Sequence, residues 1–310
     1  MNAELAEDLR PSACELKPLI DHVVRYRGKQ LRPGLVFLAG KVFDQVTPAH
    51  MTAAKVVELI HTATLVHDDI LDSAEVRRQE PTLNQLHGNE VPVLLGDYIY
   101  ALAFHMAVQL DDPACARLFS AAVRTVCEGE ITQCLHRGDV AWDEARYFEV
   151  ITQKTAILYG AAGQIGAHYA SATPAQTAAM SEFGTDLGIA FQIMDDCLDL
   201  TGVEAVVGKS LGTDLGLGKL TLPLLQLLEN SGDRRPRLLE LVSSNGSERT
   251  AAEGLRELRA EFDVDASVEY SLSRARGFVD SGLRALDALP QGSARDAMAT
   301  LADYVLRRNF

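Results

Sequence analysis

The chain has 310 residues, of which 47% are hydrophobic and 23% charged, and its formal net charge is −14. A chain this long and this apolar can bury a large core, which excludes intrinsic disorder and leaves room for one or two domains. The acidic balance argues against a general binder of nucleic acids or anionic membranes, because both require a basic surface.

The apolar pattern along the chain is helical, and alternating strand patterns are nearly absent. Residues 49–72 place apolar or small side chains at helical spacing, among them Ala53, Val57 and Ile60. Prolines open many of the helical stretches, where proline is tolerated. Further helices are predicted at 91–110, 114–136, 143–169, 175–201, 219–230, 249–261, 265–288 and 293–307. Several are apolar around much of their circumference, which is typical of helices in the middle of a bundle.

No internal repeat, low-complexity tract or linker divides the sequence, so we expect one all-α domain over residues 1–310. The five cysteines are scattered and form no CxxC pair, which indicates neither a disulfide framework nor a zinc site. The first residues lack the features of a signal peptide, and no stretch of about 18 uncharged apolar residues occurs. We therefore expect a cytoplasmic protein without a membrane span.

Two acidic DDxxD segments each follow a long apolar helical stretch, at 68–72 and 195–199. The first and last aspartates of each segment share one helical face about 6 Å apart, where like charges repel. The dipole at a helix C-terminus adds to that repulsion, so a cation should offset it. Oxygen-only ligands of this kind suit Mg²⁺ held together with substrate phosphates. A solvated acidic helix end would explain one such segment but poorly explains two.

A ferritin-like di-iron bundle is another way to use buried carboxylates. It requires two ExxH motifs, whereas Glu58 and His61 form a single one. A di-iron site is therefore disfavoured.

Cations that suit phosphate lie beside the acidic segments and at breaks in the apolar pattern. Taken singly, each is most often a solvated surface charge, and His61 alone would most often be a packed core histidine. Together they predict a charged mouth on an apolar helical cavity, suited to a substrate with a diphosphate head and a hydrocarbon tail. The cations are Lys29, Arg32, Arg77, Arg78, Lys154, Lys209 and Lys219.

The order of the motifs resembles that of the trans-isoprenyl diphosphate synthases, or polyprenyl synthetases, from Gly28 to about Arg308. The motifs are GKQLRP, IHTATLVHDDILD, RRQEPT, LLGDYIYALAF, EGEITQ, KTAILYG, FQIMDDCLD and GKSLGTDLGLGKLTLPLL. The sequence departs from the family at Gln79, where a glycine is common, and in a short N-terminal segment. The resemblance implies a helical bundle around a central cavity, usually as a homodimer. It also implies condensation of isopentenyl diphosphate with an allylic diphosphate, head to tail, to an all-trans polyprenyl diphosphate.

The resemblance further implies three Mg²⁺ ions and a role for each matching side chain. Direct metal ligands would be Asp68, Asp72 and Asp195, with Asp69, Asp196, Asp199 and Asp214 acting behind them or through water. The allylic diphosphate would be held by Arg77, Lys154, Lys209 and Lys219. The diphosphate of isopentenyl diphosphate would be held by Lys29, Arg32, His61 and Arg78. The allylic cation would be stabilised by Thr155, Gln192 and the carbonyl of Lys154, and the released diphosphate would take the proton.

Small residues before the first acidic segment predict a long product. The chain would grow past Thr64 and Ala63 and then Ile60, towards the N-terminal end of the helix. A bulky aromatic at the first of these positions would stop growth early. We therefore predict products of about C30 to C50, with C20 as the alternative. Ala63 could instead be small for helix packing alone, with other helices setting the length.

Two rival functions share parts of this pattern. A class I terpene cyclase would carry an NDxxSxxxE-type second motif, but Asp199 and Val203 occupy its Ser/Thr and Glu positions. A non-catalytic subunit of a heteromeric prenyl synthase would lack intact acidic motifs, whereas both are complete here. Both observations favour the synthase.

Overall fold

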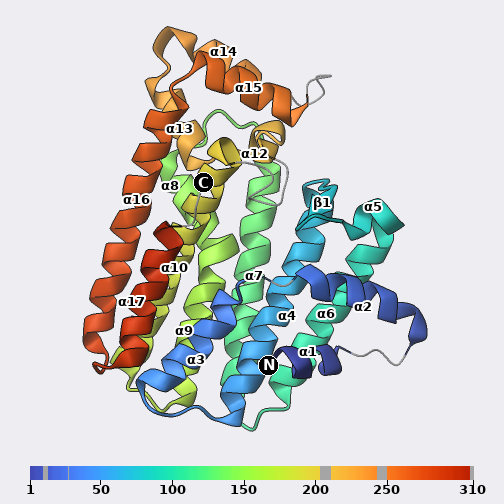
Figure 1. The fold of residues 1–310 in the computed structure, drawn as a ribbon, viewed down its shortest axis with the longest axis vertical. Coiled ribbons are helices and arrows are strands. Elements are labelled where there is room, and N and C mark those ends of the chain that lie inside the picture. The colour runs from blue at the N-terminus through green and yellow to red at the C-terminus, as the bar shows by residue number, and fades with distance from the viewer. Residues whose placement is uncertain (10–12, 27, 203–210, 243–249, 308–310) are drawn as a thin grey trace. The chain divides into compact units, whose positions relative to one another are not determined.

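Helices form nearly all the regular structure in the computed structural model (Figure 1). It describes residues 1–310 except 10–12, 27, 203–210, 243–249 and 308–310. The chain divides into two compact units. The first consists of Met1–Val123, Leu158–Gly184 and Ala285–Met298, and the second of Arg124–Ile157, Thr185–Arg284 and Ala299–Phe310. The expected single domain over 1–310 stays a prediction.

The first unit is organised around α4. This helix begins at Pro48, in the first turn where proline needs no hydrogen-bond partner, and a capping box between Thr47 and His50 closes its start. Helices α3 and α6 pack along α4 (Figure 1). The elements up to α6 are α1 (Asn2–Asp8), η1 (Cys14–Leu16), α2 (Lys17–Val23), η2 (Val24–Tyr26), α3 (Leu31–Val42), α4 (Pro48–Leu71), β1 (Val76–Arg77), β2 (Glu80–Pro81), α5 (Leu83–His87) and α6 (Glu90–Val108).

Helix α6 is the one helix among the described residues that is long and apolar enough to cross a membrane, by length and composition alone. Only 33% of its apolar window is buried. Its buried positions, such as Leu95 and Ile99, belong to the core shared with α4. Core helices of soluble proteins pass the same test, so the expected absence of a membrane span stays a prediction.

A π-helical turn interrupts the stretch predicted as one helix over 143–169. Helix α8 (Glu144–Ile151) starts at Asp143, which accepts a hydrogen bond from the amide of Arg146. It then widens into η3 (Thr152–Ala156) and continues as α9 (Ile157–Tyr169). Such turns occur frequently at functional sites. The flanking helices are α7 (Ala114–Leu135) and α10 (Pro174–Thr201).

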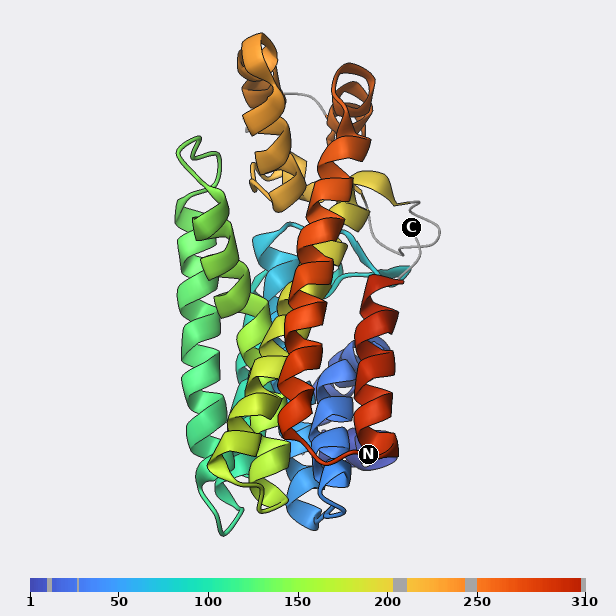
Figure 2. The same ribbon diagram turned by 90° about the vertical axis from the view of Figure 1, so that its left-hand side faces the viewer.

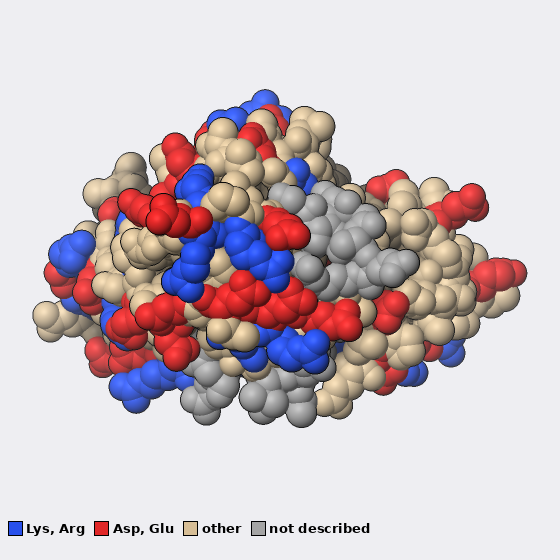
Figure 3. All heavy atoms as spheres, turned by 90° about the horizontal axis from the view of Figure 1, so that it is seen from above, with Lys and Arg blue, Asp and Glu red and all other residues tan. Residues whose placement is uncertain are grey.

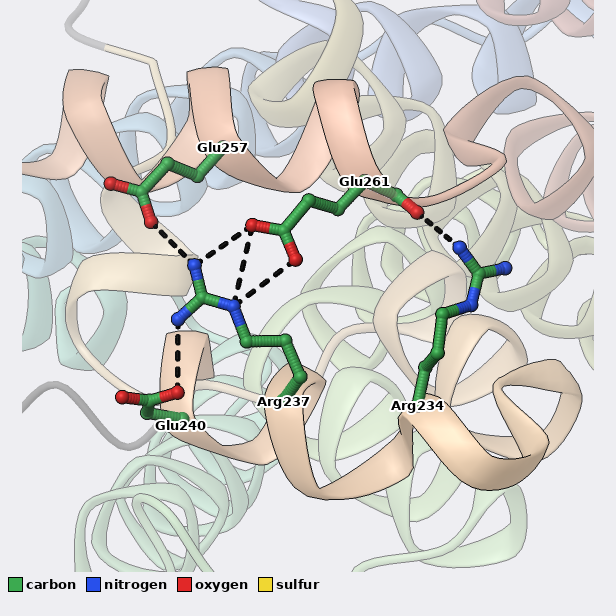
Figure 4. A network of polar contacts seen from close by, with 5 residues as sticks. All are labelled: Arg234, Arg237, Glu240, Glu257 and Glu261. Carbon is green, nitrogen blue, oxygen red and sulfur yellow. Dashed lines mark hydrogen bonds and ion pairs between the residues drawn. The ribbon is translucent and has the colours of Figure 1, made fainter.

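Short helices lie near one end of α16 in the second unit (Figure 2). A polar network joins two of them. The Arg237 guanidinium on α14 bonds Glu240, Glu257 and Glu261, and thereby ties α14 to α15 (Figure 4). These side chains are partly exposed, so the network contributes modestly to stability. The elements of this part of the chain are α12 (Thr213–Gly216), α13 (Leu222–Asn230), η4 (Gly232–Arg234), α14 (Arg235–Val242), α15 (Ala251–Glu261) and α16 (Val264–Ala285). They are followed by η5 (Leu286–Ala288), which belongs to the first unit, and α17 (Ser293–Leu306), whose residues up to Met298 do so as well.

The predicted helices match these bounds to within a few residues, apart from the π turn. The helix expected from 219 begins at Leu222, because Thr221 is its N-cap and Pro223 lies in its first turn. The sequence patterns did not reveal the β1–β2 hairpin. Acidic and basic side chains mix on the face shown in Figure 3, so the net charge of −14 does not form a single-sign patch there.

Candidate active site

The first acidic segment forms the last turn of α4 in the first unit. The amide of Asp72, the C-cap residue, donates to the carbonyl of Asp68 over 2.8 Å. Asp68 and Asp72 are half-buried, and Asp69 between them is buried. The predicted pair of carboxylates one turn apart is therefore present at the C-terminus of the helix.

Asp69 forms an ion pair with Arg77, which was predicted to bind diphosphate. Nε of Arg77 donates to Oδ1 of Asp69 over 2.6 Å. Burial raises the pKa of Asp69, although the Arg77 charge opposes that shift. Burial, together with the Asp69 charge, raises the pKa of the nearby Tyr26 phenol to about 12. Arg77 thus fixes the position of the Asp69 side chain in the last turn of α4.

Arg77 reaches Asp69 from a tight hairpin. Strands β1 and β2 pair antiparallel, with Arg77 opposite Glu80, and Arg78 and Gln79 form the two-residue turn. Both turn residues have positive φ, 53° and 67°, as in the type I′ turns that favour glycine. This is the physical reason why a glycine suits position 79.

Four of the side chains predicted to bind diphosphate lie together in the first unit. The charges of Arg32, Arg77 and Arg78, together with burial as the largest cause, hold the pKa of His61 well below its usual range. His61 is therefore neutral at pH 7. The Arg32 guanidinium stacks over the ring of Tyr159, 4.2 Å from its centroid. Lys29, the remaining predicted cation of this group, is exposed just before α3.

The second acidic segment lies in the last two turns of α10, in the second unit. Asp195 is half-buried, whereas Asp196 and Asp199 are buried. Oδ1 of Asp199 accepts from the Thr213 hydroxyl and Oδ2 from the amide of Asp214, over 3.0 Å and 3.1 Å. Asp199 therefore anchors the start of α12 through both of its oxygens.

Lys219 is brought next to this anchored segment. Its Nζ lies 3.6 Å from Oδ1 of Asp214, and its side chain is only 7% exposed. The amide of Lys219 also donates to the Asp214 carbonyl. The other lysine predicted here, Lys209, lies outside the described residues.

The π turn presents Lys154 and Thr155 to two different helices. Nζ of Lys154 donates to Oε1 of Gln133 over 2.9 Å and lies 3.2 Å from Oε1 of Glu130, both on α7. The Thr155 hydroxyl donates to Oε1 of Gln192 on α10 over 2.8 Å. The structure thus joins the predicted pair Thr155 and Gln192 directly.

Two hydrogen bonds hold Asp196 in place. Nε2 of Gln192 donates to its Oδ1 and the Tyr147 hydroxyl to its Oδ2, each over 2.7 Å. Burial raises the pKa of Asp196, and the charges of Asp214 and Asp195 raise it further. Whether Asp196 also acts on a metal, as the family resemblance implies, stays a prediction.

The donor set fits Mg²⁺ that a substrate diphosphate helps to bind. Among the described residues, no cluster of three or more His, Cys, Asp or Glu forms a complete metal site. Mg²⁺ is usually held by one or two carboxylates, with waters and phosphate oxygens filling the other positions. Within the first unit the half-buried carboxylates of Asp68 and Asp72 match that requirement, and within the second unit that of Asp195 does.

Known proteins are similar to this chain over nearly its whole length. The polyprenyl synthetase family model matches residues 14–258. The octaprenyl diphosphate synthase of Escherichia coli is 34% identical and covers 100% of this chain and 95% of its own length. The short chain isoprenyl diphosphate synthase of Methanothermobacter thermautotrophicus is 32% identical, with 99% and 96% covered.

Two solved structures are similar over nearly the whole chain. A polyprenyl synthase from Caulobacter crescentus, complexed with calcium and isoprenyl diphosphate, has a TM-score of 0.92 and 32% identity, with 98% of this chain and 92% of that chain covered. A decaprenyl diphosphate synthase from Rhodobacter capsulatus has a TM-score of 0.88 and 32% identity, with 99% and 94% covered.

The chain therefore belongs to the polyprenyl synthetase family. It has the all-α isoprenoid synthase fold, as predicted, and it is a prenyltransferase.

The sequence patterns missed several side chains that contact the site. Tyr147, Glu130 and Gln133 hold predicted residues, and Thr213 bonds Asp199. Glu130 and Gln133 lie in the quoted EGEITQ motif, three residues apart on one helical face, which was a readable signal. Thr213 lies in the quoted GKSLGTDLGLGKLTLPLL motif, whereas Tyr147 carries no such signal.

Proposed function

We propose that this chain is a Mg²⁺-dependent prenyltransferase that condenses isopentenyl diphosphate with an allylic diphosphate, head to tail. Its product is a long-chain all-trans polyprenyl diphosphate of about C30 to C50. The observation that carries the proposal is that both acidic segments are intact and each has one ordered cation near it. Arg77 pairs with Asp69, and Lys219 pairs with Asp214, whose amide donates to Asp199. The similarity to proteins named octaprenyl and decaprenyl diphosphate synthases supports the length.

The first unit would bind the diphosphate of isopentenyl diphosphate. Arg32 and Arg78 lie around His61, and Lys29 precedes α3. Because neighbouring charges and burial keep His61 neutral, it adds a hydrogen-bond donor without adding to the repulsion among the arginines. Arginine also suits the forked geometry of phosphate oxygens.

Asp68, Asp72 and Asp195 would hold the metal, with Arg77, Lys154, Lys209 and Lys219 as the cations for the allylic diphosphate. When bound, Mg²⁺ offsets the negative charge that develops on the leaving diphosphate. The resemblance implies three ions. Lys154 would stabilise the same charge from the π turn, where Gln133 and Glu130 hold its ammonium group in place.

The reaction would proceed by ionisation, condensation and elimination. The allylic C–O bond breaks, and the diphosphate leaves with the electron pair. The hydroxyl proton of Thr155 is donated to Gln192, so the lone pairs of Thr155 are free to face the allylic cation. The double bond of isopentenyl diphosphate attacks that cation, and loss of a proton to the released diphosphate regenerates an allylic product.

Product analysis tests the function directly. Purified protein would be incubated with labelled isopentenyl diphosphate, farnesyl diphosphate and Mg²⁺. We expect a ladder ending between C30 and C50, lost with EDTA and in Asp68→Asn and Asp195→Asn. A stop at C20 would contradict the long-chain assignment. If none of farnesyl, geranyl and dimethylallyl diphosphate is elongated, the proposed activity is rejected. That result would favour the class I terpene cyclase or the non-catalytic subunit of a heteromeric prenyl synthase.

Product length is proposed to depend on the inner side of α4. Ala63 and Ile60 are fully buried, and Thr64 is half-buried one turn before Asp68. We expect Thr64→Phe and Ala63→Phe to shift the ladder to shorter products, because an aromatic ring would meet the growing tail. Thr62→Phe, on another side of the same helix, is the control and should keep the wild-type ladder. An unchanged ladder in a folded Thr64→Phe protein would reject the assignment.

A homodimer in the cytoplasm is proposed as the working state. Val93, Leu94 and Val108 on α6 leave 42%, 68% and 65% of their surfaces exposed in the single chain. Exposed apolar surface of this kind favours association, and a second copy would cover it. Light scattering should give twice the chain mass, and Leu94→Glu with Val108→Glu should give the monomer mass. A monomeric wild-type protein would contradict this.

A further inference from the structure

A buried tyrosine that the proposed reaction does not use contacts the second acidic segment. Tyr147 lies on α8, and its hydroxyl donates to Oδ2 of Asp196 on α10 over 2.7 Å. Tyr147 is 3% exposed and Asp196 4% exposed, so water does not compete for this hydrogen bond. Burial and the charge of Asp196 raise the pKa of Tyr147 well above its usual range, so the hydroxyl keeps its proton to donate.

The hydrogen bond from Tyr147 to Asp196 is the first in a chain of three consecutive hydrogen bonds that lead to Thr155. Oδ1 of Asp196 accepts from Nε2 of Gln192, and Oε1 of Gln192 accepts from the Thr155 hydroxyl. Because Tyr147 donates to one oxygen of Asp196, the other oxygen is turned towards Gln192 and accepts from the nitrogen end of its amide. The amide oxygen then faces Thr155 and takes its proton. The orientation of Asp196 therefore determines where the lone pairs of Thr155 point.

One segment supplies both ends of this chain. Tyr147 on α8 and Thr155 in η3 belong to the same run of helix, and both contact α10. Asp196 and Gln192 are four residues apart on α10, so they share a helical face. The four side chains form a closed connection between the two helical segments within the second unit.

We propose that Tyr147 is a positioning residue for the prenyl transfer reaction. By holding Asp196, it sets the Gln192 amide so that Thr155 presents lone pairs, rather than a proton, to the allylic cation. Tyr147 itself need not touch either substrate. This inference rests on the proposed function, because it assigns Thr155 and Gln192 to stabilisation of the cation.

Removing the hydroxyl alone tests the role. In Tyr147→Phe, Oδ2 of Asp196 loses its donor, the carboxylate can rotate, and the Gln192 amide can turn over. We expect kcat to fall by about 10- to 100-fold, the range typical for the loss of a side chain that orients a residue of the site without touching the substrate. KM for isopentenyl diphosphate should stay within about twofold, because its predicted cations belong to the first unit and lie outside this hydrogen-bonded chain.

Tyr270→Phe is the matched control. The Tyr270 hydroxyl donates to Oε2 of Glu144 over 2.7 Å, so it also joins a tyrosine to a carboxylate in the second unit. Glu144 lies on α8, as Tyr147 does, but outside the chain that reaches Thr155. Tyr270→Phe should keep the wild-type kcat. An equal loss in both variants would indicate a general effect on α8 and would overturn the proposal.

Binding supplies a readout that does not depend on turnover. An ammonium analogue of the allylic diphosphate, with nitrogen at the cationic carbon, should bind the wild type more tightly than a neutral thio analogue. Calorimetry should show this preference reduced in Tyr147→Phe and kept in Tyr270→Phe. In kinetics, Tyr147→Phe combined with Thr155→Val should be no slower than Thr155→Val alone, because both act through one hydroxyl.

The outcomes separate this inference from the proposed function. If the wild-type protein has no elongation activity, the proposed function itself is rejected. An active wild type with unchanged kcat in Tyr147→Phe, an unchanged analogue preference, or additive losses in the double variant would reject the positioning role alone.

Discussion

A buried histidine at the start of α4 uses both of its ring nitrogens in hydrogen bonds, and the bond at Nδ1 requires the neutral form of the ring. Nδ1 of His50 accepts from the amide of Thr47 over 3.1 Å, and Nε2 donates to the carbonyl of Gly166 over 2.9 Å. A protonated ring could not accept from Thr47. Burial lowers the pKa of His50, against a smaller raising effect of the Gly166 carbonyl. His50 thus links the start of α4 to α9 within the first unit.

This geometry predicts a loss of stability in mild acid. The pKa of His50 is lower in the folded state than its ordinary value of 6.5, so below about pH 6.5 the unfolded chain binds more protons. The free energy of unfolding should therefore fall as the pH drops through that value towards the folded pKa. His50→Gln keeps a donor and an acceptor without titrating. Urea unfolding from pH 7.5 to 5 should show a shallower decline in this variant, and equal declines would contradict the assignment.

At the scale of single residues, the charged part of the site is largely predictable from sequence. Asp68, Arg77 and Lys154 are recognisable in the sequence because they are charged residues within or beside apolar stretches. Burying a charge costs free energy unless the charge is paired, so such residues indicate a site. Their hydrogen-bonding partners cannot be recognised in this way. Tyr147 is one more aromatic residue in an amphipathic helix, and only the packing of α8 against α10 gives it Asp196. Partnerships fixed by tertiary contact leave no periodic trace in the sequence.

At the scale of elements, the π turn is what most distinguishes the structure from the sequence pattern. The apolar spacing over 143–169 predicts one helix, because a single wide turn barely alters the periodicity. Gly129 on α7 faces that turn: a Cβ there would lie 2.8 Å from Cβ of Gln153 and 3.0 Å from the amide nitrogen of Lys154. Glycine therefore allows the close approach through which α7 holds Lys154.

Gly129→Ala tests whether this close contact matters. Alanine normally favours a helix over glycine by about 1 kcal/mol, but here the added methyl group must displace the turn at a cost of about 1–3 kcal/mol. We expect unchanged or lower stability, and a kcat reduced by about tenfold through the displaced Lys154.

Gly277→Ala provides the matched comparison for that variant. Gly277 is an exposed glycine within α16, and nothing lies within 4 Å of the Cβ that it would gain. It should stabilise the protein by about 0.5–1 kcal/mol and leave kcat unchanged. If thermal melts and turnover respond alike to both substitutions, Gly129 has no special role.

At the scale of the whole molecule, the two compact units share helices rather than a linker. The boundary between them falls inside α7, after Val123, and inside α10, after Gly184. Helix formation is cooperative, since each hydrogen-bonded turn stabilises the next. Breaking a continuous helix at such a boundary would therefore cost both units free energy. This favours the expectation of a single folding domain over residues 1–310.

Cooperative unfolding is the consequence that can be measured. The sole tryptophan, Trp142, lies in the second unit and reports on it by fluorescence, whereas far-UV circular dichroism follows the helices of both units. We expect the two urea transitions to coincide. Ile99→Ala removes a fully buried side chain from α6 in the first unit, which should cost about 2–5 kcal/mol. Because the helices continue across the boundary, the Trp142 transition should shift with the circular dichroism transition, although the substitution lies in the other unit. Helical signal lost before the Trp142 signal would instead mean that the first unit unfolds alone.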